Sequence, residues 1–168
     1  MSIEGRGAGV YVYLRSSRTD GRASDSRGLL DADVEALVNT VNTMGVMGKG
    51  LALQFKRRFA ANFHAYAAAC KRGEVAIGRM FVVETDGLAR PRYLINFPTK
   101  KHWRDPSQLT YVREGLAALV KEIRVRGIRS IAVPPLGCGN GGLAWSDVKP
   151  LIEHAMAELI PFHMPEVL

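Results

Sequence analysis

Short apolar runs alternate along this chain with longer segments in which apolar residues recur every three or four positions. The runs at 36–38, 80–83, 93–97 and 131–133 are typical of buried strands. The segments at 50–59, 62–70, 111–123 and 145–159 are predicted helices, the last opened by Ser146 and Asp147 near its start. Strands that alternate with helices build layered sheets. The sequence therefore predicts an α/β domain with a largely parallel or mixed sheet.

The predicted elements fit one domain of ordinary size, because the chain has 168 residues. Residues 1–28 are predicted to form an N-terminal arm, polar and rich in Arg, Ser and Gly, with a possible short strand at 10–14. Residues 29–168 form the domain, and 160–168 lead into one more strand that the end of the sequence cuts short.

Composition narrows the class of protein. No apolar run approaches the roughly 20 residues that span a bilayer, and the 10–14 run is too short for a signal peptide. The 2 cysteines are too few for a disulfide framework, so we expect a cytoplasmic protein without membrane contact. The net charge of +7 favours phosphate-bearing partners. A solvated basic surface without a partner is equally compatible with that charge.

Two glycine-rich loops follow predicted strands and precede predicted helices. The first, 39–50, contains Gly48-Lys49-Gly50 but lacks the Ser or Thr of a Walker A loop. The second, 134–143, has four glycines between Gly137 and Gly142, a backbone able to curl around a pyrophosphate. Ligands of such sheets bind at the carboxyl ends of strands, where helix starts offer free N–H groups. We therefore expect one phosphate-bridged ligand between the loops, the alternative being mobile surface connections.

A third segment of interest follows the 93–97 run, which Pro98 is predicted to end. It places cations and aromatic rings side by side: Lys100, Lys101, His102, Trp103 and Arg104. Interleaved rings and cations suit stacking on an unpaired base together with phosphate contact. A solvated basic turn with Trp103 packed as a lid fits the same composition.

Taken together, these segments resemble the macrodomain family. Residues 39–43, Asn-Thr-Val-Asn-Thr, resemble its Asn-x-x-Asn signature. Residues 47–56 resemble the branch that contains the DarG-type DNA ADP-ribosyl glycohydrolases and the human terminal ADP-ribose protein glycohydrolase. Five further features fit that branch: Thr99-Lys100, Pro134, Gly137-Cys138-Gly139, Leu143 and Trp145. The resemblance implies a three-layer α/β/α macrodomain with a central mixed sheet, ADP-ribose as ligand or product, and no cofactor.

The resemblance also assigns roles to residues. Lys100 and Asn42 would be catalytic, Asn42 by bonding the distal ribose. The ligand would be bound by Asn39, Thr43, Met47, Gly48, Lys49, Gly50, Thr99, Leu136, Gly137, Cys138, Gly139, Asn140, Gly141 and Gly142. The interleaved rings and cations, rather than the resemblance, make Lys101, His102, Trp103 and Arg104 the candidates for contact with DNA. We expect no metal, and we interpret His102, His154 and Cys138 as structural rather than as an acid, a base or a nucleophile.

The sequence departs from the family pattern at two places. Gly141 stands where the human relative has a catalytic Asp in the second loop. Arg27-Gly28 stands where the family has an adenine-contacting Asp, which Asp25 could replace after a local shift.

The implied activity is removal of ADP-ribose from thymidine bases in single-stranded DNA. Lys100 would act as a nucleophile on the sugar or as a cation that stabilises the departing base. In this family the activity serves as an antitoxin to a DarT-type toxin, which would bind through a domain absent from this chain, here expected to be a monomer. The alternatives are a non-catalytic ADP-ribose reader, a glycohydrolase of ADP-ribosylated protein side chains, and an antitoxin that acts only by contacting its toxin.

Overall fold

The computed structural model describes residues 11–14 and 26–159 of the chain. In chain order its elements are β1 (Tyr11–Leu14), a 3-10 helix (Ser26–Asp31), β2 (Ala36–Asn42), α1 (Gly50–Arg58), α2 (Ala60–Lys71), β3 (Phe81–Glu84), β4 (Tyr93–Lys100), α3 (Leu109–Arg126), β5 (Ser130–Val133) and α4 (Trp145–Ala157). The predicted alternation of strands and helices is present. The predicted strand near the N-terminus exists as β1, whereas the rest of 1–25 and the predicted final strand at 160–168 lie outside the described residues.

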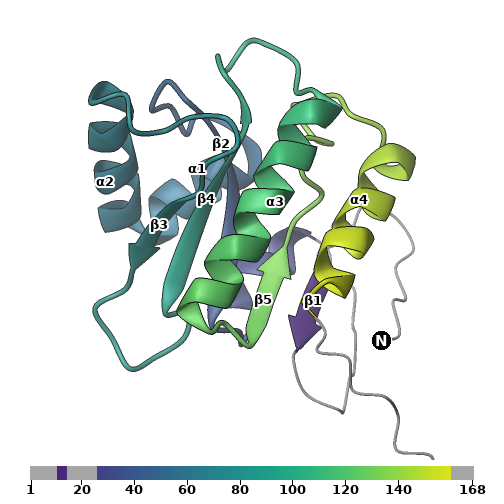
Figure 1. Ribbon diagram of the computed structural model, residues 1–168. Helices are drawn as coiled ribbons and strands as arrows, with labels where there is room; N and C mark the ends of the chain where they lie inside the picture. The colour runs from purple at the N-terminus through teal and green to yellow at the C-terminus, as the bar shows by residue number, and fades with distance from the viewer. Residues whose placement is uncertain (1–10, 15–25, 160–168) are drawn as a thin grey trace, which may run out of the picture.

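The five strands form one sheet in the order β1-β5-β2-β4-β3. The central strand β2 runs parallel to both β4 and β5, while the outer strands β1 and β3 are antiparallel to their neighbours (Figure 1). The predicted mixed sheet is therefore confirmed. Because β2, β4 and β5 are parallel, their carboxyl ends lie at the same edge of the sheet.

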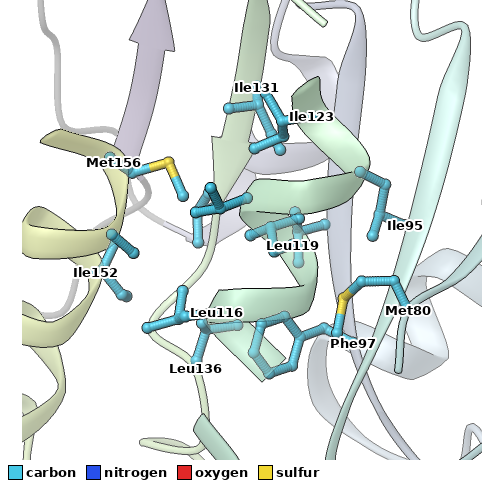
Figure 2. Close-up of a cluster of buried hydrophobic side chains, with 14 of the residues drawn as sticks. Met80, Ile95, Phe97, Leu116, Leu119, Ile123, Ile131, Leu136, Ile152 and Met156 are labelled. Carbon is cyan, nitrogen blue, oxygen red and sulfur yellow. The ribbon is translucent and has the colours of Figure 1, made fainter. Parts of the chain in front are cut away.

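Alternate residues of the central strands pack against opposite faces of the sheet. Val38 and Ile95 belong to a cluster with α3 and α4, and Leu37 and Leu94 belong to a second cluster with α1 and α2. Figure 2 shows the first cluster, in which Leu116, Leu119, Ile123, Ile152 and Met156 of the helices surround Ile95, Phe97, Ile131 and Leu136. Two helices thus cover each face, and the three-layer α/β/α architecture is confirmed.

Two strands extend further than predicted, and Pro98 does not end one of them. β4 continues through Pro98 to Lys100, and β2 continues past Val38 to Asn42. Proline is tolerated where a strand has a free edge, because the missing N–H then removes no ladder bond. β3 pairs with β4 only as far as Asn96, so Pro98 has a neighbouring strand on the β2 side alone.

α4 begins at Trp145, as predicted, and Ser146 and Asp147 lie in its first turn. The N-cap residue is Ala144, which makes no side-chain cap hydrogen bond, and the backbone N–H of Asp147 donates to the Ala144 carbonyl. A carboxylate in a first turn still interacts favourably with the helix dipole.

Candidate functional site

Three loops meet at the carboxyl edge of the sheet. They comprise residues 43–49 after β2, residues 101–108 after β4, and residues 134–144 after β5. The first two loops are joined by Thr43, whose N–H and hydroxyl donate to the Lys101 carbonyl at 3.0 and 2.9 Å. The first and third come together at Gly50, where an added Cβ would lie 3.2 Å from Nδ2 of Asn140. The structure thus brings the two glycine loops to one place.

A bulge in the sheet sets Asn42 and Lys100 opposite each other. Val41 pairs with Pro98 and Asn42 with Lys100, so Thr99 is the extra residue on β4. Residues directly opposite on neighbouring strands have Cα atoms roughly 5 Å apart. The bulge therefore brings together the two residues that the resemblance assigns to catalysis, a common use of bulges near active sites. Thr99 itself is 3% exposed, so it supports the bulge from within.

The Asn42 carboxamide shapes the first loop. Its Nδ2 donates to the Val46 carbonyl at 2.8 Å, and its Oδ1 accepts from the N–H groups of Met44 at 2.9 Å and Val46 at 3.4 Å. The Tyr66 hydroxyl lies 2.7 Å from the Asn42 carbonyl oxygen and 3.0 Å from Oδ1, and it shares its single hydrogen between them. The amide nitrogen carries a second hydrogen, beyond the one given to Val46. Asn42 as a whole is 7% exposed.

A buried network of three asparagines underlies the same loop. Asn96 Nδ2 donates to Asn62 Oδ1 at 2.8 Å, and Asn39 Nδ2 lies 3.4 Å from Asn96 Oδ1 and 3.8 Å from the Met47 sulfur. Asn39 is 0% exposed and Met47 1%, although both were predicted to contact ligand. In this structure they support the loop from below. The sequence could have indicated this network, because Asn96 interrupts an otherwise apolar strand and Asn62 interrupts an otherwise apolar helix face.

The start of α1 offers backbone donors next to the second glycine loop. Gly48, Lys49 and Gly50 are exposed, and the N-cap residue Lys49 makes no side-chain cap hydrogen bond. The first amide bonded within this turn is that of Leu53, which donates to the Lys49 carbonyl at 3.3 Å. The N–H groups before it have no intrahelical partner, which makes a helix start an anion site. Gly50 has φ +56, a conformation that glycine adopts without strain.

The second loop has an exposed and a buried side. Gly139, Asn140 and Gly142 are exposed, whereas Leu136, Gly137 and Gly141 are buried. The loop is closed by the Leu143 N–H, which donates to the Gly137 carbonyl at 3.0 Å. The Gly142 N–H donates to the Gly139 carbonyl at 3.2 Å, so Gly139 and Asn140 are the exposed residues that can offer N–H groups to a ligand, and the buried residues hold the curl.

The departure from the family pattern at Gly141 has a structural reason. A Cβ at this position would lie 2.3 Å from Oγ of Ser107 and 2.4 Å from the Gly137 carbonyl oxygen. Ser107 lies beneath the loop, donates its N–H to the Gly141 carbonyl at 2.9 Å, and has a buried hydroxyl with no hydrogen-bond partner among the described residues. The loop in this conformation has no room for an aspartate at residue 141. Nothing in the sequence spacing pointed to Ser107.

Lys100 lies where β4 meets the second loop. Its Nζ donates to the Asn140 carbonyl at 3.2 Å and to the Trp103 carbonyl at 3.4 Å. Partial burial lowers the pKa of Lys100, and the negative charge of Asp105 opposes that shift. The amine therefore loses its proton at a lower pH than a free lysine does, which favours the neutral nucleophilic form.

The turn after Lys100 carries a stack of rings and cations. His102 and Trp103 stack with centroids 5.3 Å apart, and the Arg104 guanidinium lies 4.5 Å from the Trp103 ring. His102 Nδ1 accepts the Arg104 N–H at 3.1 Å, so its proton is on Nε2 in this arrangement. Trp103 is 44% exposed, which disagrees with the alternative of a packed lid. Among the described residues, no carboxylate lies within ion-pair distance of Lys49, Lys101 or Arg104.

The other candidate residues, Cys138 and His154, do not fit the roles of nucleophile, acid or base. Burial raises the pKa of the Cys138 thiol to about 11, which disfavours the thiolate that a nucleophile requires. His154 lies in the last turn of α4, at the opposite end of that helix from the loops, next to Glu158. Over the described ranges, no group of three His, Cys, Asp or Glu side chains is placed to hold a metal ion. None of the helices described is long and apolar enough to cross a membrane.

Comparison with known proteins identifies the family. A family model described as the Macro domain matches residues 38–152. The DNA ADP-ribosyl glycohydrolase of Thermus aquaticus is 63% identical over 131 residues, which are 78% of this chain and 36% of the relative. The chain thus spans little more than a third of that relative's length.

Two solved structures agree with the family model. The macrodomain of Mycobacterium tuberculosis DarG has a TM-score of 0.77 and 62% identity, over 78% of this chain and 86% of that one. Thermosipho africanus DarTG in complex with ADP-ribose has a TM-score of 0.75 and 36% identity, over 83% of this chain and 39% of that one. With its fold, its loops and these matches, the chain belongs to the macrodomain family.

Proposed function

We propose that this chain binds ADP-ribose where the two glycine loops meet and removes it from thymidine bases in single-stranded DNA. The observation that carries the proposal is the position of Lys100, whose Nζ contacts the second loop while its strand neighbour Asn42 shapes the first. The relatives named DNA ADP-ribosyl glycohydrolase support the same activity, at 61–63% identity.

Binding would rest on backbone donors and unpaired cations. The N–H groups at the start of α1 lie where the two glycine loops meet, at Gly50 and Asn140, and the second loop adds those of Gly139 and Asn140. Such donors match the oxygens of a pyrophosphate. Lys49, Lys101 and Arg104 form no ion pair with a carboxylate of the described residues, so their positive charge favours an anionic ligand.

Catalysis would begin with attack of the Lys100 amine on C1″ of the ribose. A bond forms between Nζ and C1″ as the bond to the thymine nitrogen breaks, and the thymine leaves with the electron pair. The proton released by the attacking amine neutralises the departing base. Water then replaces the amine at C1″ and completes the hydrolysis. The lowered pKa of Lys100 serves the first step, because only the neutral amine has a free electron pair.

The stack of His102 and Trp103, of which Trp103 is 44% exposed, supports single-stranded DNA as the substrate. An unpaired base has a flat face that stacks on an aromatic ring, and the charges of Lys101 and Arg104, next to these rings in the chain, suit the adjoining phosphates. An antitoxin role is part of the proposal, with a DarT-type transferase as partner. The Thermosipho africanus relative is named as a fusion of a DNA ADP-ribosyl transferase with a DNA ADP-ribosyl glycohydrolase.

The test compares the native chain with Lys100→Ala on an oligonucleotide ADP-ribosylated at thymidine, with product masses measured over time. We expect the native chain to release ADP-ribose and to restore the unmodified oligonucleotide, and the variant to be at least a hundredfold slower. Lys121→Ala, which changes an exposed lysine on α3, is the matched control and should keep the native rate.

The same assay separates the competing functions. Binding of ADP-ribose without release from DNA or protein would indicate a reader. Release from glutamyl-ADP-ribosylated protein but not from DNA would indicate a protein glycohydrolase. Capture of the transferase in the absence of ADP-ribose, without any release, would indicate an antitoxin that acts by contact alone. Unchanged release by Lys100→Ala would remove this lysine from the mechanism.

A further inference from the structure

We propose that Tyr66 is a positioning residue for this site: its hydroxyl holds Asn42 in the orientation that gives the first loop its ligand-binding shape. The inference rests on the proposed binding of ADP-ribose between the glycine loops and adds a residue that lies outside those loops. Tyr66 is on α2, which belongs to none of the three loops at the carboxyl edge of the sheet.

Tyr66 reaches the end of β2 from below. The side chain is 0% exposed, and its ring packs in the cluster between the sheet and the α1–α2 layer. The hydroxyl donates at 2.7 Å to the Asn42 carbonyl and lies 3.0 Å from Asn42 Oδ1. Burial raises the pKa of this phenol above its ordinary value, so the group remains a hydrogen-bond donor at every physiological pH.

The hydrogen bonds around Asn42 fix which end of its amide faces inward. The Tyr66 hydroxyl shares its single hydrogen between the Asn42 carbonyl and Oδ1, and Oδ1 also accepts the N–H groups of Met44 and Val46. A reversed amide would turn its own N–H hydrogens toward these two backbone N–H groups and lose both bonds, which is unfavourable in a buried site. The hydroxyl, the amide and the turn at 43–46 therefore form one connected set of hydrogen bonds.

The loop also packs directly on α2 beside this set. Gly45, with φ +89, would place a Cβ 3.4 Å from the Cys70 Cβ and 3.5 Å from the Ala67 Cα. The first loop must therefore cross α2 at close range, with Gly45 in a left-handed backbone conformation, before it reaches Gly48 and Gly50. A loop held in its bound shape before the ligand arrives loses less entropy on binding. Tyr66 and Asn42 provide that restraint.

The test is a double-mutant cycle on ADP-ribose affinity, measured by calorimetry. Tyr66→Phe removes only the hydroxyl, and we expect it to weaken binding about tenfold. Asn42→Ala should weaken binding at least as much. In the Asn42→Ala background, Tyr66→Phe should change the affinity by less than about threefold, because the partner is already gone. Tyr93→Phe, at the other end of the sheet, should keep the native affinity.

Additive effects in the cycle would overturn the proposal, since a residue that merely supports the fold would weaken each background equally. A second readout needs no ligand or substrate. Hydrogen exchange at the Met44 and Val46 amides should accelerate about tenfold in Tyr66→Phe and stay unchanged in Tyr93→Phe. Hydrogen exchange still tests whether Tyr66 restrains the first loop, even if the native chain proves to act on another ADP-ribose conjugate. Unchanged exchange in Tyr66→Phe would refute it.

Discussion

A single added methyl group at Gly141 should disrupt the second loop, although the same change two residues away should be tolerated. In Gly141→Ala the new Cβ would lie 2.3 Å from Ser107 Oγ and 2.4 Å from the Gly137 carbonyl oxygen. The serine hydroxyl can rotate away, but the carbonyl belongs to the backbone of the same loop. The loop must therefore open by about 1 Å to restore an ordinary contact.

The size of the effect follows from that displacement. Overpacking of a well-packed site costs about 1–3 kcal/mol, and the Gly137 carbonyl also accepts the Leu143 N–H that closes the loop. We expect the free energy of unfolding to fall by about 2 kcal/mol. ADP-ribose affinity should fall at least tenfold, because a misplacement of about 1 Å in a positioned site has effects of this order.

Urea unfolding followed by circular dichroism measures the stability, and calorimetry measures the affinity. Gly139→Ala is the matched control for stability, since a Cβ there meets nothing within 4 Å and the change should stay within about 0.5 kcal/mol of native. Adding Ser107→Ala to Gly141→Ala should recover only part of the loss, because the Gly137 contact remains. Equal stability of Gly141→Ala and Gly139→Ala would refute the reasoning.

Three further predictions follow from the same geometry. The pKa of Lys100 is lowered, so its neutral amine accumulates at a lower pH than that of a free lysine. The release rate at saturating substrate should therefore increase with pH and level off at a lower pH than a free lysine would give. A rate that stays flat or falls over this range would contradict attack by the neutral amine. Trp103→Ala should weaken binding of the modified oligonucleotide roughly 5- to 150-fold, measured by fluorescence anisotropy, but leave the affinity for free ADP-ribose unchanged. Leu88→Ala, at another exposed residue, is the control. Equal losses of affinity for both ligands would contradict stacking of a DNA base on Trp103. Gly115→Ala should lower the free energy of unfolding by about 1–3 kcal/mol, because its Cβ would lie 2.3 Å from the Phe97 ring. The control Ala117→Ser, on the exposed side of α3, should change the free energy of unfolding by less than about 0.5 kcal/mol. Native-like stability of Gly115→Ala would show that α3 can move away from the sheet.

The layered fold was predictable from local patterns. Apolar residues at three- and four-residue spacing predicted the four helices, although α3 extends two residues earlier and three later than expected, to Leu109 and Arg126. The four predicted internal strands are present within a few residues of their expected positions. These features follow from the sequence because burying one face of a helix or strand imposes a period that the chain itself must carry.

The candidate site was predictable only in outline. Its glycine loops were recognisable because several glycines follow predicted strands and precede predicted helices, and its lysine was recognisable from the resemblance to the macrodomain family. Asn39, Met47 and Thr99 were expected to contact the ligand, and in the structure all three are buried, at 0%, 1% and 3% exposed. Side-chain direction at a strand end depends on register, and here a bulge at Thr99 sets the register.

The sequence by itself determined the order of helices and strands, the two glycine loops, and the excess of positive charge, since each of these depends on residues close together in the chain. Tertiary structure alone decided that Pro98 stays within a strand, that Asn42 lies opposite Lys100, that Ser107 leaves no space for a side chain at Gly141, and that Tyr66 bonds Asn42. Most of these are contacts between residues far apart in sequence. The place of Pro98 depends on which strands lie beside β4 at that position. Such contacts depend on how the layers pack, and no local period or propensity records them.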